Sequence, residues 1–303
     1  MRHSPSPPPA VAAMAKRLDD PLANAVPLDA ASLFSVKGKV ALCTGGATGI
    51  GLMISKALVA NGAVVYICSR KKPAIDKAVE ELNTQFARLG GKAISLPGDL
   101  SNLSGVEAVV ASLGAQTTKL DILVANAGVT WGAPYDEYPD SAWQKVMDVN
   151  VRHVFNLIQK LTPLLELSAS KGDPSRVITI ASVDGVRASQ TQGPTAAFAY
   201  TVSKGAVVHL TKALCRALSS RNITVNCIAP GLFPSQMTKF IAEADLWNMQ
   251  AKLNPLGRNG QTSDMAGTAL YLCSKAGAFT NGVTITLDGG LLLHDAGLGF
   301  SKM

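Results

Sequence analysis

The stretch 39-KVALCTGGATGIGLMISKAL-58 joins a short apolar run to a segment with helical periodicity through a glycine-rich turn. The run 39–44 is typical of a buried strand, and the apolar spacing after the turn is typical of a helix. Glycine at Gly45, Gly49 and Gly51 permits a tight turn and a close approach of the backbone to a ligand. The helix that follows offers unpaired N–H groups and the positive end of its dipole to an anion. The stretch therefore predicts a strand, a phosphate-binding turn and a helix.

The spacing of these glycines, G-x3-G-x-G, differs from the G-x-G-x-x-G of the commoner dinucleotide-binding turn. No GK[ST] follows, so the turn is not a nucleotide P-loop. A glycine-rich turn without a ligand is the alternative interpretation. The position between a first strand and a first helix favours a dinucleotide.

Further β-rich runs follow, separated by segments with helical periodicity. One such segment is 74–89, in which four apolar residues share a face: Val79, Leu82, Phe86 and Leu89. Alternating strands and helices indicate right-handed crossovers and a parallel sheet that is covered on both faces. The sequence thus predicts an α/β fold: a single doubly wound Rossmann-type domain whose parallel sheet has about seven strands. The further runs lie at 63–68, 92–97, 121–125, 176–181, 224–229 and 283–288.

Composition suits one compact domain, since 47% of the 303 residues are hydrophobic and 16% are charged. We expect a flexible extension over 1–36, a catalytic domain over 37–290 and a tail over 291–303. The extension lacks the apolar region of a secretory signal, and no apolar run reaches the length of about 18 residues that spans a membrane. The five cysteines are single and without CxxC spacing, as free thiols in a reducing compartment are. We expect a cytoplasmic protein.

The formal charge of +7 raises the question of a nucleic-acid partner. The basic residues are scattered, however, and no zinc-finger, basic-zipper or RNP pattern accompanies the tight cluster at 70–72. An anionic small molecule explains that cluster better, so no nucleic-acid partner is predicted. The four histidines have no HExxH or paired spacing, and no metal is predicted.

The end of the second strand distinguishes between the two nicotinamide dinucleotides. In 66-YICSRKK-72, Ser69 stands where an acid would bind the ribose 2′-hydroxyl of NAD, and Arg70 and Lys71 follow. A guanidinium can hold a 2′-phosphate through a fork of hydrogen bonds. A solvated basic loop is the alternative, and NADP(H) is the favoured cofactor.

The segment 198-FAYTVSKGAVVHLTKAL-214 predicts a helix with Tyr200 and Lys204 on one face, one turn apart. A nearby ammonium and a positive nicotinamide favour a phenolate, so we expect the pKa of Tyr200 to be lowered by about three units. Ser182 follows the fifth strand, where its hydroxyl could bind a substrate oxygen or simply cap a turn.

Several short motifs follow one another in a fixed order along the chain: TGGATGIG at 44–51, ANAG at 125–128, DVN at 148–150, Ser182, and YTVSK at 200–204. With this series the chain resembles the single-domain short-chain dehydrogenases/reductases over residues 37–290. Within that family the chain is similar to 3-oxoacyl-carrier-protein reductases, including the type associated with rhamnolipid biosynthesis, in 163–185 and 229–242.

The resemblance implies roles for four catalytic residues. Tyr200 exchanges a proton with the carbonyl oxygen, and Ser182 orients that oxygen. Lys204 binds the nicotinamide ribose, and Asn150 holds a helix kink and a water in a proton relay. Asp99 matches a cofactor contact but could also be the N-cap of a helix beginning near Leu103. The implied cofactor-binding residues are Thr44, Gly45, Gly46, Thr48, Gly49, Ile50, Gly51, Ser69, Arg70, Lys71, Asp99, Leu100, Asn126, Ala127, Gly128, Tyr200, Lys204, Pro230, Gly231 and Leu232.

The sequence departs from the family pattern at two places. Ala125 replaces the first Asn of the usual NNAG, which predicts weaker local hydrogen bonding with cofactor binding retained. Ser182 and Tyr200 lie 18 positions apart, where the family commonly has fewer. The extra residues fall in 187–198, and we expect substrate choice to depend on them.

Together these features predict an NADPH-dependent carbonyl reductase whose substrate is a 3-oxoacyl thioester or a bulky hydrophobic ketone. An oxidative alcohol dehydrogenase of specialised metabolism and a dinucleotide-sensing regulatory protein without turnover remain as alternatives. We expect the irregular stretch 231–260 to be a mobile apolar lid, with Trp131 and Phe198 nearby. The helices near 151–168 and 200–218 are expected to pair in a homodimer or homotetramer. The apolar lid residues are Phe233, Met237, Trp247 and Met249.

Overall fold

The computed structural model describes residues 27–188, 191–239 and 246–294. The chain divides into a unit of residues 1–33 and a unit of residues 34–303. The described part of the first unit contains the short helix α2 (Ala30–Leu33), next to which Asp29 accepts hydrogen bonds from the backbone and hydroxyl of Ser32. Most of the predicted extension and tail lies outside the described residues.

Within the described part of the second unit, seven parallel strands form one sheet in the order β3-β2-β1-β4-β5-β6-β7. Each predicted β-rich run coincides with one of these strands to within a residue or two, which confirms the predicted fold class. The chain order of the strands reverses between β1 and β4, the place where doubly wound sheets bind ligands. The strands are β1 (Val40–Thr44), β2 (Val64–Ser69), β3 (Lys92–Pro97), β4 (Ile122–Ala125), β5 (Ser175–Ile180), β6 (Ile223–Pro230) and β7 (Thr284–Leu287).

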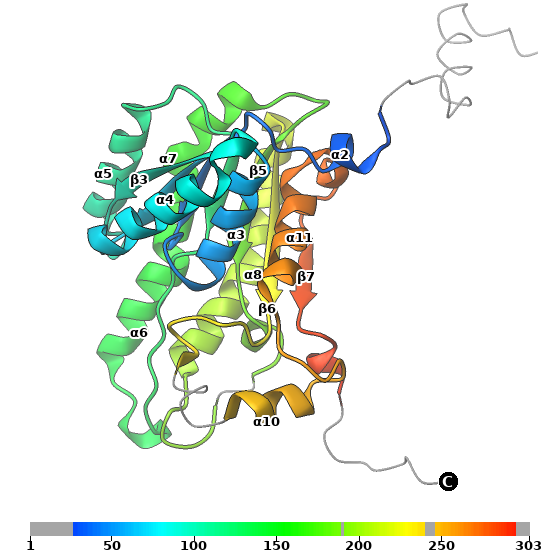
Figure 1. The fold of residues 1–303 in the computed structure, drawn as a ribbon. Helices are drawn as coiled ribbons and strands as arrows, with labels where there is room; N and C mark the ends of the chain where they lie inside the picture. The colour runs from blue at the N-terminus through cyan, green and yellow to red at the C-terminus, as the bar shows by residue number, and fades with distance from the viewer. Residues whose placement is uncertain (1–26, 189–190, 240–245, 295–303) are drawn as a thin grey trace, which may run out of the picture. The chain divides into compact units, whose positions relative to one another are not determined.

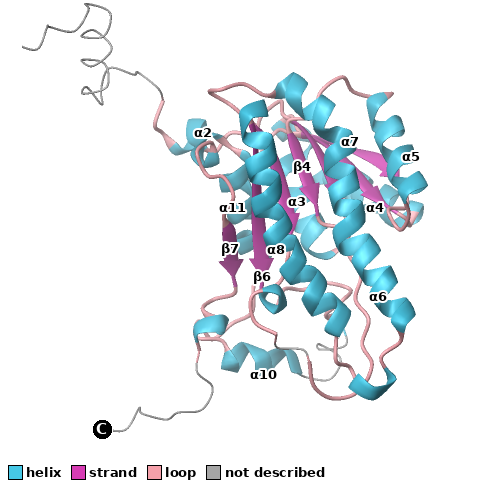
Figure 2. Cartoon of the chain, turned by 180° about the vertical axis from the view of Figure 1, so that it is seen from behind, coloured by secondary structure: helices cyan, strands magenta, loops and turns pink. Residues whose placement is uncertain are grey.

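Helices cover both faces of this sheet. α3, α4 and α11 pack on the face seen in Figure 1, and α5, α7 and α8 pack on the face seen in Figure 2. α10 lies at the end toward which β6 and β7 run (Figure 1). In the described ranges, no helix has the length and apolar character needed to cross a membrane. The helices in the described part of this unit are α3 (Gly49–Ala60), α4 (Lys72–Phe86), α5 (Leu103–Gly114), α6 (Asp140–Met147), α7 (His153–Ser168), α8 (Phe198–Leu218), α10 (Leu246–Leu253) and α11 (Thr262–Cys273).

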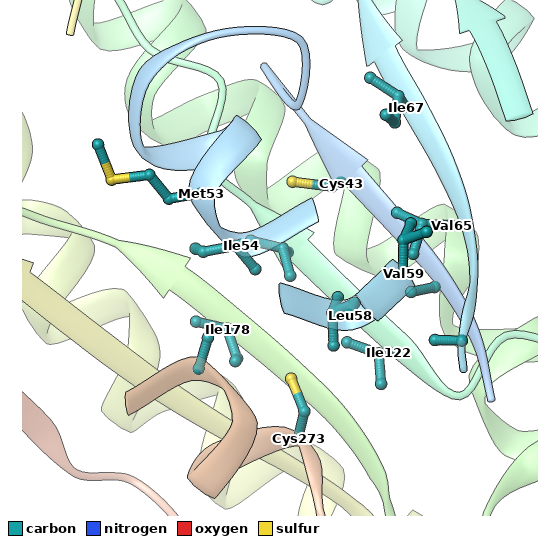
Figure 3. Packing of buried hydrophobic residues seen from close by; sticks show 14 of the residues in the cluster. Cys43, Met53, Ile54, Leu58, Val59, Val65, Ile67, Ile122, Ile178 and Cys273 are labelled. Carbon is teal, nitrogen blue, oxygen red and sulfur yellow. The ribbon is translucent and has the colours of Figure 1, made fainter. Parts of the chain in front are cut away.

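Buried hydrophobic side chains fill both spaces between the sheet and its helices. On the α3 side, Ile54 and Leu58 of the helix pack with strand residues such as Ile178, and all three are at most 1% exposed (Figure 3). The five cysteines are free and all but one are buried, as predicted. Burial raises the pKa of the Cys43 thiol to about 12, so this residue behaves as a core side chain.

The helix predicted over 74–89 ends earlier than its periodicity suggests. After α4, the chain tightens into a 3-10 turn, η1 (Ala87–Leu89), which Gly90 ends with a left-handed φ of 78°. The change of helical pitch turns Leu89 outward to 53% exposure. The prediction that Leu89 shares a buried face with Leu82 is therefore wrong.

The segment predicted to be an irregular lid, 231–260, contains the helix α10, while residues 240–245 lie outside the described part. Phe233 is 2% exposed, and its ring lies so close to Gly260 that a Cβ there would clash. Phe233 is thus a core residue, and its assignment to a lid surface is wrong. Met237 and Met249 are exposed.

Candidate active site

β1 ends in a turn whose glycines leave no room for side chains. Gly45 and Gly49 have φ values of 64° and 52°, and a Cβ on Gly51 would lie 2.2 Å from the carbonyl oxygen of Gly45. Thr48 is the N-cap of α3, but its side chain makes no capping hydrogen bond. Among the described residues, the first-turn N–H groups of α3 therefore have no side-chain partner. This turn fits a pyrophosphate group.

Thr44 and Asn126 connect the ends of β1 and β4. The N–H groups of Asn126 and Ala127 both donate to Oγ1 of Thr44 at 3.0 Å. The Asn126 amide donates to the carbonyl oxygens of Thr44 and Gly45 at 2.9 and 3.3 Å. Ala125 is a buried strand residue whose side chain cannot take part in these bonds, so the weakening predicted from it stays a prediction.

The basic cluster after β2 contains paired and unpaired cations. Lys72 forms an ion pair with Asp76, whose other carboxylate oxygen accepts a hydrogen bond from Ser95 at 2.9 Å. Arg70 and Lys71 are exposed, and their side chains have no hydrogen bond or ion pair within the described part of the chain. These two cations are free to contact a phosphate beside the end of β2.

The other predicted cofactor residues follow the carboxyl ends of the sheet strands. Asp99 accepts a hydrogen bond from the N–H of Ser101, whereas the N-cap of α5 is Asn102, whose side chain accepts from the N–H of Gly105 at 2.8 Å. The alternative that Asp99 caps this helix is therefore wrong. The predicted cofactor residues that end or follow β2, β3 and β6 are Ser69, Asp99, Leu100, Pro230, Gly231 and Leu232.

Tyr200 and Lys204 lie in the first two turns of α8, which starts at Phe198. Lys204 is 5% exposed, and its Nζ donates to the carbonyl oxygen of Ile180, the last residue of β5, at 2.7 Å. The same Nζ lies 5.6 Å from the centre of the Tyr200 ring. Burial lowers the pKa of Lys204 to about 8. The structure thus brings together the pair indicated by the helical spacing.

Ser182 begins the 3-10 turn η4 (Val183–Gly185) directly after β5. Its hydroxyl accepts from the N–H of Asp184 at 3.1 Å and lies 3.3 Å from Oδ2 of that residue, to which it can donate. Ser182 therefore caps a turn and also lies close enough to Tyr200 for its hydroxyl to lower the pKa of the phenol. Asp184 is 5% exposed. This buried carboxylate was not among the predicted site residues, although it stands two positions after a serine at a strand end.

Burial raises the pKa of Tyr200 to about 12. A hydrogen bond with Ser182 acts in the opposite direction, and the negative charge of Asp184 adds to the rise. The protein's own side chains therefore raise the pKa of Tyr200, because desolvation disfavours the phenolate more than Ser182 stabilises it. The lowering predicted above requires a positive nicotinamide beside the phenol and stays a prediction.

Asn150 lies in a π-helical turn, η3 (Asp148–Arg152), between α6 and α7. Its side chain exchanges hydrogen bonds with the backbone of Val129 at 2.8 and 2.9 Å, and it donates to the hydroxyl of Ser203 at 2.9 Å. A Cβ on Gly128 would lie 3.2 Å from Oδ1 of Asn150 and 3.6 Å from Nζ of Lys204. The helix irregularity predicted at Asn150 is present, and it ties the segment after β4 to α8.

Comparison with known proteins identifies the family. A family model described as enoyl-(acyl carrier protein) reductase matches residues 45–292. A rhamnolipids biosynthesis 3-oxoacyl-[acyl-carrier-protein] reductase from Pseudomonas aeruginosa is 42% identical over 86% of this chain and 98% of that protein.

Solved structures agree with this assignment. The active-site complex of Pseudomonas aeruginosa RhlG with NADP has a TM-score of 0.79 at 42% identity and covers 86% of this chain and 98% of its own. A gluconate 5-dehydrogenase from Burkholderia cenocepacia, in complex with NADP and tartrate, has a TM-score of 0.75 at 30% identity and covers 88% of this chain and 100% of its own.

This chain belongs to the short-chain dehydrogenase/reductase family. Its resemblance to that family is confirmed, and it is an enzyme of the oxidoreductase class. Where the chain is described, no group of three or more His, Cys, Asp or Glu is placed to hold a metal ion.

Asp184→Asn should shift the pH dependence of alcohol oxidation to lower pH. The charge of Asp184 raises the pKa of Tyr200, whereas an amide is neutral and keeps an acceptor for Ser182. If Tyr200 exchanges the proton, as the family resemblance implies, oxidation requires its phenolate, which forms at lower pH in the variant. Rates of oxidation measured against pH test this, with Asp136→Asn, at an exposed carboxylate, as the control. A profile that stays in place or moves to higher pH would contradict this role of Asp184.

Proposed function

We propose that this chain is an NADPH-dependent carbonyl reductase. The observation that carries the proposal is the convergence of Ser182, Tyr200 and Lys204 at the carboxyl edge of β5. The glycine turn that fits a pyrophosphate follows β1 at the same edge of the parallel sheet. A dinucleotide on that turn can extend toward the three side chains across the place where strand order reverses.

The proposed chemistry is proton transfer coupled to hydride transfer. Bound NADPH supplies the hydride to the carbonyl carbon. Tyr200 donates its proton to the carbonyl oxygen, and its raised pKa keeps the phenol protonated at neutral pH, the form that reduction needs. Ser182 orients the oxygen through its hydroxyl. Lys204, whose pKa burial lowers to about 8, can exchange a proton near neutral pH and so return one to Tyr200.

Preference for NADPH over NADH is proposed to come from the unpaired cations after β2. Arg70 can bind a 2′-phosphate through two hydrogen bonds, and Lys71 adds a positive charge. The neighbouring Asp76 is occupied by Lys72 and Ser95, so it does not neutralise them. That relatives have been solved with NADP supports this assignment.

A hydrophobic substrate is supported by α10, which lies at the carboxyl end of β6 and β7 (Figure 1). None of its residues is buried. Met249 and Leu253, one turn apart on the same face, are 49% and 44% exposed. This apolar face suits a 3-oxoacyl thioester or a bulky ketone. The similarity to gluconate 5-dehydrogenase makes a sugar-acid ketone the second candidate.

Two further properties are proposed with the function. The intact Tyr200–Lys204 pair favours an enzyme over a non-catalytic sensor. Phe155 of α7 and Val202 of α8 are 39% and 49% exposed, which suits burial against a second copy of the chain. A homodimer or homotetramer therefore stays our prediction.

Tyr200→Phe should reduce turnover by roughly 100-fold or more, because the proton donor is lost. NADPH binding, followed by the fluorescence of the cofactor, should stay nearly unchanged. Tyr271→Phe, which removes the phenolic hydroxyl of a tyrosine on α11, is the matched control and should keep full activity.

Turnover is measured as NADPH consumption, and this assay also compares 3-oxoacyl thioesters, bulky ketones and 5-ketogluconate as substrates for the wild-type protein. Faster NADPH consumption with the sugar acid would replace the proposed substrate class. Full turnover by Tyr200→Phe would remove Tyr200 from the mechanism.

Arg70→Asp should shift cofactor preference toward NADH. A charge-assisted hydrogen bond contributes about 1.5–3 kcal/mol, so kcat/KM for NADPH relative to NADH should fall by roughly 10- to 100-fold. Lys72→Ala is the control, because the ammonium of Lys72 is already paired with Asp76, and it should change the ratio little. An unchanged ratio in Arg70→Asp would mean that other residues bind the 2′-phosphate.

A further inference from the structure

The N-terminus of α8 is capped by a residue far away in the sequence. Ala197 is the N-cap residue and has no side-chain acceptor. The N–H of Ala199 lies in the first turn, where a helix provides no acceptor of its own, and Ala199 is fully buried. This N–H donates to the phenolic oxygen of Tyr138 at 3.2 Å. Tyr138 thus does for α8 what a serine or aspartate does at most helix starts.

The phenol of Tyr138 is oriented for this task. Its hydroxyl donates to the carbonyl oxygen of Trp131 at 3.1 Å, which leaves its lone pairs directed to the Ala199 N–H. The ring packs edge-on against Phe198 and Trp143, with centroids 5.4 and 6.1 Å apart. Phe198, which was expected near the substrate, is therefore part of an aromatic cluster that holds the start of α8.

Two backbone contacts add to this attachment. The N–H of Ala133 donates to the carbonyl oxygen of Ala196 at 3.1 Å. Gly132 lies so close to Thr195 that a Cβ on the glycine would be 2.9 Å from the carbonyl oxygen of Thr195. The segment 131–138 thus fastens the C-terminal part of 187–198, the stretch in which the sequence departs from the family pattern; residues 189–190 lie outside the described part.

We propose that Tyr138 is a positioning residue that fixes the place of the Tyr200 phenol. The hydrogen bond to Ala199 holds the residue directly before Tyr200, and this inference rests on the proposed role of Tyr200 as proton donor. A displacement of about 1 Å at a reacting group can lower a rate roughly 100-fold. The loss of one hydrogen bond, with the aromatic ring kept, should displace Tyr200 less than that.

Tyr138→Phe in the full-length protein tests the proposal, because it removes the hydroxyl and keeps the ring. We expect kcat to fall by about 10-fold while KM for NADPH stays within about two-fold, since the cofactor turn is untouched. Hydrogen exchange of peptides covering 198–204 should become faster. Tyr135→Phe is the matched control: Tyr135 packs against the same Phe198 ring, but its side chain is 76% exposed and has no hydrogen bond within the described residues. It should change neither readout.

Each outcome bears on the proposal. Unchanged exchange in Tyr138→Phe would overturn the anchoring of α8, whether or not a substrate has been found. Faster exchange with an unchanged kcat would overturn the positioning of Tyr200. A fall in kcat matched by an equal fall in NADPH affinity would also contradict it, because cofactor binding would then be the affected step. If the proposed function itself is wrong, the wild-type protein will consume no NADPH. This result distinguishes failure of the proposed function from failure of the positioning role of Tyr138.

Discussion

The hydrogen bond from Nζ of Lys204 to the carbonyl oxygen of Ile180 fixes the reactive end of α8 to the sheet. A buried amine needs a partner, and the end of a parallel strand offers a carbonyl group that no neighbouring strand has taken. The bond fixes the position of α8 along the direction of β5, and it thereby places Tyr200 beside Ser182. It also holds the amine in a site where burial lowers its pKa to about 8.

The chain after β4 gives α8 its second and third attachments. At Val129 it is tied through Asn150 to Ser203, and at Tyr138 it caps the helix start at Ala199. The same chain begins at Asn126, which binds the glycine turn after β1. One continuous segment therefore connects the turn that fits a pyrophosphate with the helix that carries the proposed proton donor. This segment therefore fixes the position of the glycine turn relative to the start of α8.

Local patterns were enough to predict the fold, and they indicated several residues that the structure brings together at the candidate site. Glycines between a strand and a helix identified the β1–α3 turn, and a spacing of one helical turn paired Tyr200 with Lys204. Burial was less predictable, because it depends on contacts between distant segments. The desolvation that raises the pKa of Tyr200 was not foreseen for this reason, and Asp184 was missed. Its turn, η4, packs so tightly on α8 that a Cβ on Gly185 would lie 2.5 Å from the Lys204 backbone. The cap from Tyr138 joins positions 61 apart and leaves no local signal.

A crystal structure of the protein with NADP+ tests the central claim, that one bound dinucleotide connects the glycine turn to Tyr200 and Lys204. Our account predicts the pyrophosphate against the N-terminus of α3, the 2′-phosphate beside Arg70, and the nicotinamide ring facing Tyr200. A nicotinamide ring bound away from Tyr200, with Lys204 out of contact with the cofactor, would contradict it.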